Sequence, residues 1–233
     1  MALAIDGTAT GNSSTLTVAC TLTTAQPNDL IYVVAGTGTG NATDLDATTI
    51  ADTAGLSWTQ RVNYGEGNSA GVIVFYAIAS SPLSSDVITV TLDKSAEEPC
   101  SIVAFGISGA NTSSPFDPNF PLGGGSAAAT TITTAAFSTT YANEMILLGV
   151  GIAAAQTSFT AGDIGGTLSS IVANELSNTA TGMEYLVVSS VQSSITATLS
   201  WNNSAKFASV HDAIVAAGAA PSNHFLALLG AGT

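Results

Sequence analysis

Residues 87–92 read VITVTL, and apolar side chains alternate there with threonine. Successive side chains of a β-strand point to opposite faces, so this alternation predicts a half-buried strand. Residues 16–22 (LTVACTL) alternate in the same way. The apolar runs at 30–35, 72–79 and 101–107 predict further strands, because each is short and is followed by turn residues.

The second half of the chain repeats the order of the first. The segment ITATL at 195–199 repeats ITVTL at 88–92, and the turn Asn-Glu at 143–144 repeats Asn-Asp at 28–29. The order of the strands persists while the loops change length, which is typical of one supersecondary unit used twice.

These patterns predict an all-β fold, a jelly-roll-like antiparallel β-sandwich made of two pseudo-repeated halves. We expect one domain over residues 1–233, with halves at 1–121 and 126–217 and an apolar tail at 218–233. The halves are joined by Gly-Gly-Gly-Ser at 123–126 rather than by a long polar linker, which favours one sandwich. The alternative is two tandem small β-sandwiches.

The composition excludes several classes of function. Apolar residues make up 46% of the chain and charged residues only 8%, with a net charge of −13. Binding to nucleic acid or to an anionic membrane needs clustered basic side chains, and the chain has only Arg61, Lys94 and Lys206. We therefore expect no nucleic-acid partner and no membrane partner.

The sequence shows no targeting or membrane-spanning signal. No run approaches the roughly 20 apolar residues that a transmembrane helix needs, and the start MALAIDGTATG lacks the basic and apolar regions of a signal peptide. This predicts assembly inside a cell, followed by release through lysis.

Cys20 and Cys100 both lie in apolar, strand-like stretches. They are expected to be buried free thiols that pack as small hydrophobes, and a disulfide between them is the alternative. No spacing of cysteine and histidine suggests a zinc site.

Residues 41–52 could bind a metal ion. Asn41, Asp44, Asp46 and Asp52 offer oxygen ligands of the kind that Ca²⁺ prefers, although their spacing matches no EF-hand. A solvated loop without an ion is the other interpretation, and no further cofactor is expected.

No residues form a recognisable catalytic group. His211 and Asp212 are adjacent, so on a strand they point to opposite faces and cannot form a relay. Glu184 and the pair at 97–98 are weak candidates for the two carboxylates of a glycosidase. The glycine-rich segments at 36–40 and 162–166 are not followed by a predicted helix, as a phosphate-binding loop would be, and are expected to be turns. We expect a protein that is not an enzyme.

Four aromatic residues could stack on sugar rings: Trp58, Tyr64, Tyr76 and Trp201. Trp58 and Trp201 begin or end apolar strands, so packing in the core is the other interpretation for both.

Residues 52–61 read DTAGLSWTQR, and the chain continues with FYA at 75–77, ITVTL at 88–92, AFGISGA at 104–110 and ANEM at 142–145. This order resembles a family of mostly uncharacterised phage and bacterial surface proteins with concanavalin-like jelly-roll sandwiches. The segment Asp-x-Ala-Gly-Leu-x-Trp-Thr is its most specific part.

The resemblance covers most of residues 13–217 and implies virion decoration, a fibre or an adhesin, and contact with glycans. It implies no catalytic residues. The leading hypothesis is a non-enzymatic virion structural protein, a capsid decoration or head-surface protein of a tailed phage. It would be assembled in the host cytoplasm and would bind the major capsid protein and copies of itself as a homo-oligomer. The alternative is a carbohydrate-binding adhesin or a tail or fibre component, extracellular or on a cell surface.

The apolar tail carries Phe225, Leu226, Leu228 and Leu229. These side chains either pack back on the sandwich or contact a neighbouring subunit, as an exposed apolar cluster would.

Overall fold

The protein is all-β, as the sequence predicts. The computed structural model describes residues 2–38, 45, 48–66, 70–93, 99–175 and 179–219. Within these ranges the strands pair in antiparallel sheets that form a sandwich, and no α-helix occurs. None of the residues that are described forms a helix long and apolar enough to cross a bilayer.

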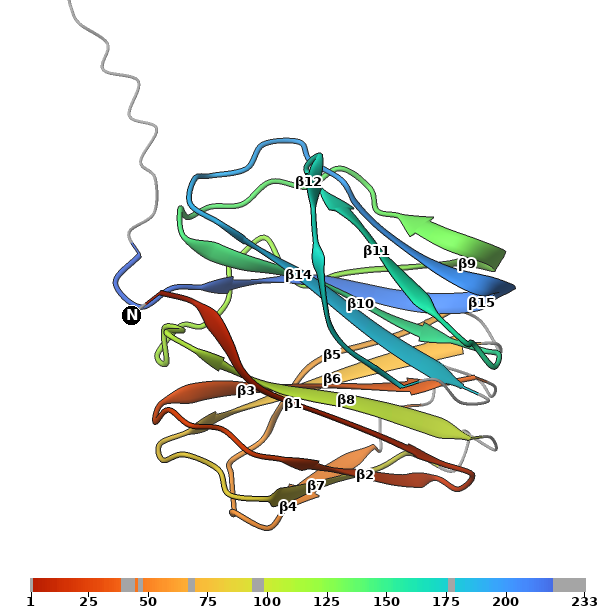
Figure 1. Ribbon diagram of the computed structural model, residues 1–233, viewed down its shortest axis with the longest axis horizontal. Coiled ribbons are helices and arrows are strands. Elements are labelled where there is room, and N and C mark those ends of the chain that lie inside the picture. Colours follow the sequence, from red (N-terminus) through yellow and green to blue (C-terminus); the bar gives the residue numbers. More distant parts are fainter. Residues whose placement is uncertain are drawn as a thin grey trace, which may run out of the picture.

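The first half of the chain forms two sheets (Figure 1). The larger one has the order β1 (Ala4–Ser13), β8 (Cys100–Ser108), β3 (Asp29–Thr37), β6 (Ala70–Ala79) and β5 (Thr59–Glu66). The smaller one has the order β2 (Thr17–Leu22), β7 (Asp86–Thr91) and β4 (Thr49–Asp52).

The second half forms one seven-stranded sheet that curls over itself. Its strands are β9 (Leu122–Thr133), β10 (Glu144–Ile152), β11 (Phe159–Ile164), β12 (Thr167–Leu168), β13 (Ser170–Glu175), β14 (Ala180–Val188) and β15 (Ala197–Val215). Strand β15 is 19 residues long, and its pairing with β9 shifts register on both sides of Ala205. The start of β15 pairs with β11, and its end pairs with β10.

The repeat that the sequence predicts has a structural counterpart. Strand β3 lies between β6 and β8, and β10 lies between β14 and the end of β15. Asn28 and Asn143 precede these central strands with φ of 63° and 59°, and Ser85 and Ser194 form a second matched pair at 52° and 51°. Left-handed backbone at a residue other than glycine is uncommon, so its recurrence at matching turns marks equivalent positions.

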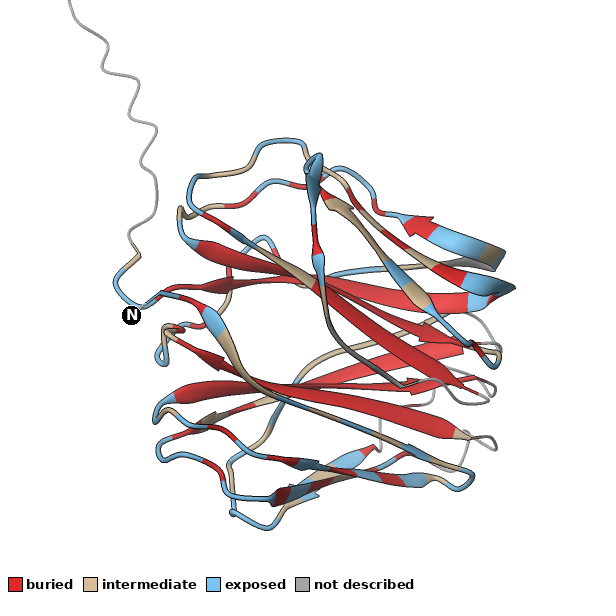
Figure 2. Ribbon diagram, in the orientation of Figure 1, coloured by how far each residue is buried: buried red, intermediate tan, exposed pale blue. Residues whose placement is uncertain are grey.

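Each half has its own apolar core, and a third core lies between the halves. Figure 2 shows that the buried residues concentrate on the central strands that face each other across the middle of the molecule. Along β3, Leu30, Tyr32 and Val34 face this middle core, whereas Ile31 and Val33 face the core of the first half. A strand covered on both faces needs no polar face, which explains the unbroken apolar run at 30–35.

Both cysteines are free and buried, so no disulfide joins them. Burial raises the pKa of Cys20 to about 12 and that of Cys100 to about 11, so both thiols stay protonated at neutral pH. An inert thiol that packs as a small hydrophobe is the expected behaviour of such a residue.

Candidate functional site

The predicted calcium loop is only partly described. Asn41, Asp44 and Asp46 lie outside the described residues. Asp52 is described, and its carboxylate accepts hydrogen bonds from the Leu56 amide at 3.1 Å and from the Trp58 indole Nε1 at 2.6 Å. The loop itself therefore supplies donors to this carboxylate. No group of three metal-ligating side chains occurs within the ranges given above.

Hydrogen bonds within this loop explain the motif Asp-x-Ala-Gly-Leu-x-Trp-Thr at residues 52–59. Asp86 on β7 accepts hydrogen bonds from the Thr53 amide at 3.0 Å, the Thr53 hydroxyl at 2.7 Å and the Ala54 amide at 2.9 Å. Gly55 follows with φ of +77°, a conformation that favours glycine. Two carboxylates thus hold residues 53–58 against the smaller sheet of the first half, so the motif has a structural role.

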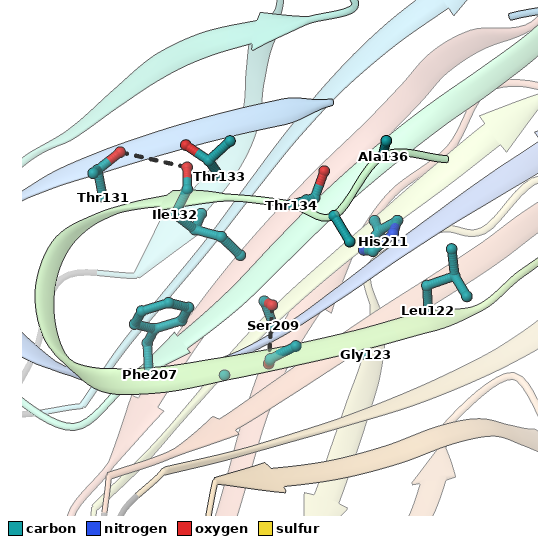
Figure 3. A pocket seen from close by; sticks show the side chains of 13 residues that line it. Leu122, Gly123, Thr131, Ile132, Thr133, Thr134, Ala136, Phe207, Ser209 and His211 are labelled. Carbon is teal, nitrogen blue, oxygen red and sulfur yellow. Dashed lines mark hydrogen bonds between the residues drawn. The ribbon is translucent and has the colours of Figure 1, made fainter. Parts of the chain in front are cut away.

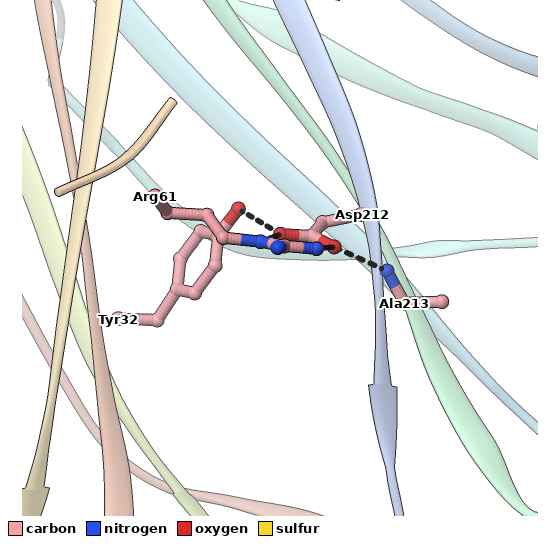
Figure 4. Close-up of polar contacts among 4 residues, drawn as sticks. All are labelled: Tyr32, Arg61, Asp212 and Ala213. Atoms are coloured by element: carbon pink, nitrogen blue, oxygen red, sulfur yellow. Dashed lines mark hydrogen bonds and ion pairs between the residues drawn. The ribbon is translucent and has the colours of Figure 1, made fainter. Parts of the chain in front are cut away.

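Asp212 connects the two halves (Figure 4). The side chain is fully buried, and the Arg61 guanidinium donates to it through two nitrogens, each at 3.0 Å. The Tyr32 hydroxyl donates at 3.2 Å and the Ala213 amide at 2.9 Å. Arg61 also lies over the Phe116 ring, 4.0 Å from its centroid. Tyr32 on β3 and Arg61 on β5 belong to the first half and Asp212 on β15 to the second, so these hydrogen bonds position one half on the other.

Two pairs of carboxyl groups recur at equivalent places. Asp29 and Glu144 begin the central strands β3 and β10 and are fully buried. Burial, followed by the neighbouring Asp6 carboxyl, raises the pKa of Asp29 to about 7. Burial, followed by Asp117, raises the pKa of Glu144 to about 8. Two carboxyl groups that face each other are stable when they share one proton.

The other member of each pair is held by donors from a turn. Asp6 accepts from the Ala25 amide at 2.6 Å and from the Gln26 amide at 2.8 Å. Asp117 accepts from the Asn119 amide at 2.7 Å and from the Thr140 hydroxyl at 3.0 Å. The amide hydrogen bonds to Asp6 outweigh the effect of burial and lower its pKa, so Asp29 is the group of that pair that keeps the proton. In the second pair it is Glu144 whose pKa is raised.

His211 points away from Asp212, as the alternation along β15 requires. Asp212 faces the middle core, whereas His211 contacts Phe120 and Phe137 at ring-centroid distances of 6.0 and 5.0 Å. Only 4% of His211 is exposed, and neither ring nitrogen has a hydrogen-bond partner. Burial lowers its pKa to about 4, so the imidazole is neutral at neutral pH.

A cavity of about 600 Å³ opens beside His211 (Figure 3). It lies between the two arms of the bent strand β9, and alternate residues of β15 line its floor. The lining residues are Leu122, Gly123, Gly124, Gly125, Thr131, Ile132, Thr133, Thr134, Ala135, Ala136, Phe207, Ser209 and His211. A volume of this size is within the usual range for small-molecule sites.

The sequence alone did not reveal this cavity. Strand pairing places His211 opposite Leu148 on β10, where the first half has Ala104 opposite Val33 on β3. A histidine at an interior position that is apolar in the other repeat is the signal that could have identified the site.

Of the carboxylates considered for glycosidase chemistry, Glu184 and the pair at 97–98, the structure describes only Glu184. Residues 97–98 lie outside the described residues. Glu184 is buried on β14 and accepts from the Ser169 hydroxyl at 2.7 Å and the Gly162 amide at 3.1 Å. Burial raises its pKa to about 7. Its partners come from the turn region around β11 and β12, so it stabilises that region.

The four aromatic candidates for sugar stacking are all at least partly buried. Trp201 is 4% exposed and donates its indole hydrogen to the Ala129 carbonyl at 2.9 Å. Trp58 donates its indole hydrogen to the Asp52 carboxylate, and Tyr64 lies against Gly123. Tyr76 packs edge-on against Phe116 and also lines a shallow hollow of about 460 Å³ beside residues 54–57.

The tail residues proposed as partner contacts, Phe225, Leu226, Leu228 and Leu229, lie outside the described residues. Comparison of the chain with family models, with curated proteins and with solved structures finds no match. The likeness to phage and bacterial surface proteins therefore stays a prediction.

Proposed function

We propose that this chain is a non-enzymatic structural protein of a virion, a capsid decoration or head-surface protein of a tailed phage. In this proposal it assembles with copies of itself and with the major capsid protein, and it acts by burying flat, uncharged surface. The observation that carries the proposal is the placement of six acidic side chains inside the fold.

Several acidic side chains serve as internal connectors. Among the residues that the structure describes, six acidic side chains are buried: Asp29, Asp86, Asp117, Glu144, Glu184 and Asp212. Arg61, one of three basic residues, is engaged with Asp212. Surface charges must lose water when two proteins associate, and interface cores are accordingly poor in charge. Placing these six groups internally leaves fewer charges on the exterior, which suits lasting contact with another protein.

The outer face of the sheet β2–β7–β4 illustrates this. Thr17, Thr91 and Thr49 lie side by side across the three strands, and Ala19 and Ala51 flank Thr89 in the next row. This threonine face, defined as Thr17, Ala19, Thr21, Thr49, Ala51, Val87, Thr89 and Thr91, contains only hydroxyl and apolar side chains. Such a face can lie on a neighbouring protein without desolvating an ion.

The opposite end of the molecule has similar chemistry. There β9, the start of β15 and β11 carry Thr131, Thr133, Thr160, Thr198 and Ser200. Figure 1 places this region and the threonine face at the two far ends of the stacked sheets. Two hydroxyl-rich ends, the second of which also carries Asp163 on β11, support a role as a building block in an assembly.

The proposal is tested by fractionating lysates of a culture that produces the protein. Intact particles are separated on a density gradient, and the chain is followed with an antibody. We expect it to sediment with the particles and to resist a wash in about 1 M salt, because few charged contacts hold it. Recovery only in the soluble fraction would overturn the virion role.

Carbohydrate binding is a second candidate function, and one observation favours it. The shallow hollow lined by Tyr76, Ser57, Thr59 and Ser80 combines an aromatic ring with hydroxyl groups, as sugar sites do. Glycan-array binding that Tyr76→Ala abolishes in folded protein would support this function, and an array without any signal would count against it.

A further inference from the structure

We propose that the cavity between the arms of β9 is a binding site for a small uncharged ligand with a hydroxyl or amide group on an apolar body. The hydrogen-bonding group would contact His211, and the apolar body would lie against Ile132 and Phe207. This inference concerns the interior of the second half and does not depend on the virion role.

The polar atoms of the cavity define the ligand chemistry. No aspartate, glutamate, lysine or arginine is among the lining residues. The Thr131 hydroxyl donates to the Leu199 carbonyl at 3.2 Å, and the Ser209 hydroxyl donates to the Gly124 carbonyl at 3.0 Å. Both hydroxyl hydrogens are therefore used within the protein, whereas the two ring nitrogens of His211 are unpartnered.

A neutral imidazole carries one N–H donor and one acceptor nitrogen. A hydroxyl or an amide can bind either ring nitrogen, since each of these groups can both donate and accept, whereas a carboxylate can only accept and an ammonium ion can only donate. The pKa of His211, lowered by burial to about 4, keeps the ring in this neutral form across the physiological range. An anionic or cationic ligand would also lose its water in a cavity that offers no opposite charge.

The first half of the chain serves as an internal comparison. Strand pairing aligns Cys100, Ile102 and Ala104 of β8 with Phe207, Ser209 and His211 of β15. In the first half these positions belong to a continuous apolar core. In the second half the same positions include a hydroxyl and an imidazole and face an open cavity.

The backbone shows the same contrast. Strand β1 packs so closely on β2 that a Cβ atom added to Gly11 would clash with the Ala19 carbonyl oxygen. Gly124 occupies the matching place on β9, since it pairs with Ser209 as Gly11 pairs with Ile102. A Cβ added there would meet only the Ser209 hydroxyl, at 3.0 Å. Strands β1 and β2 thus touch in the first half, whereas the two matching arms of β9 are separated in the second half.

The separation follows from where β9 ends. Strand β2 stays regular to Leu22, whereas β9 ends at Thr133 and residues 134–136 are irregular before Phe137 bridges to Ile195. Burial of an unpartnered imidazole is unfavourable unless something satisfies it. A repeat that opens its core and places a histidine there is best explained by a ligand that enters.

The test uses the full chain and three probes of similar size. The probes are p-cresol, which has a phenolic hydroxyl, toluene, which lacks it, and 4-methylbenzoate, which carries a charge. Because the chain has only two histidines, His224→Gln leaves the imidazole of His211 as a single NMR signal. We expect p-cresol to shift that signal saturably, toluene to bind about tenfold more weakly because one hydrogen bond is missing, and 4-methylbenzoate to have no effect.

Two variants separate binding from stability. Ala135→Leu fills the cavity from an exposed position and should abolish the p-cresol shift in folded protein. Ala51→Leu makes the same change on the threonine face and should leave it intact. His211→Ala introduces the alanine found at the matching position of the first half. It should weaken the binding of p-cresol, followed here through the NMR signals of the probe itself, to the level of toluene. An unshifted His211 signal at saturating p-cresol, or equal binding by Ala135→Leu, would overturn the proposal.

Discussion

Replacing Arg61 with methionine tests how the two halves are held together. The change removes two hydrogen bonds to Asp212 and leaves that fully buried carboxylate with the Tyr32 hydroxyl and the Ala213 amide. Breaking a buried ion pair from one side costs about 3–5 kcal/mol, because the remaining charge is uncompensated. Methionine keeps much of the packing against Phe116, so the decrease in the free energy of unfolding measures the effect of removing the charge of Arg61.

A second substitution distinguishes charge from packing. Adding Asp212→Asn to Arg61→Met removes the orphaned charge, so we expect the double variant to recover at least about 1–2 kcal/mol of the loss. The free energy of unfolding is measured by urea titration, followed by far-ultraviolet circular dichroism and by tryptophan fluorescence. Coincident transitions by the two probes would justify two-state treatment.

The pH dependence gives a further check on the same variant. Without Arg61, the folded pKa of Asp212 rises further above its unfolded value near 3.8. Stability from a group with a raised pKa is present below the unfolded pKa and is lost as pH rises through the folded pKa. The loss in Arg61→Met should therefore be smaller at pH 5 than at pH 8. A loss below about 1 kcal/mol at pH 8, or no recovery in the double variant, would refute the reasoning.

Three other predictions concern the carboxyl groups of Asp29 and Glu144, the two cysteines and Asp52. The free energy of unfolding should fall as pH rises from about 5 to 8, because Asp29 and Glu144 keep protons in the folded state that the unfolded chain releases. Each contributes up to about 1.4 kcal/mol per pH unit, and Asp29→Asn with Glu144→Gln should flatten that slope in urea titrations. Cys20 and Cys100 should react with a thiol reagent only after unfolding; rapid labelling of native protein at pH 7.5 would contradict their burial. Asp52→Ala should lower stability by about 1–3 kcal/mol, because the carboxylate holds the turn that follows it; an unchanged urea midpoint would exclude that role.

Local patterns predicted the strands, because alternation reports directly on the two faces of a sheet. The segment 87–92 pairs with β2 on one side and β4 on the other, and its apolar residues face the core of the first half. The repeat was also visible, since the turns at 28–29 and 143–144 need the same left-handed asparagine. These features depend on neighbours that are close along the chain.

The candidate site depends on distant neighbours and could not be predicted in this way. Asp212 and Arg61 are 151 residues apart, and their pairing requires the two halves to stack. The cavity beside His211 arises where β9 ends at Thr133 and residues 134–136 are irregular before the bridge from Phe137 to Ile195. No rule based on alternation or spacing predicts this irregular backbone, so only the comparison of the two repeats reveals the cavity.

The central claim, that an uncharged face holds this protein in an assembly, is tested most directly by adding charge to that face. Purified Thr89→Lys/Thr91→Lys protein is added to particles that lack the chain, beside the matched control Ser113→Lys/Ser114→Lys on an exposed loop. We expect the first variant to stay folded and lose binding to the particles, and the control to bind like the unmodified protein. Equal binding by both variants would contradict the claim.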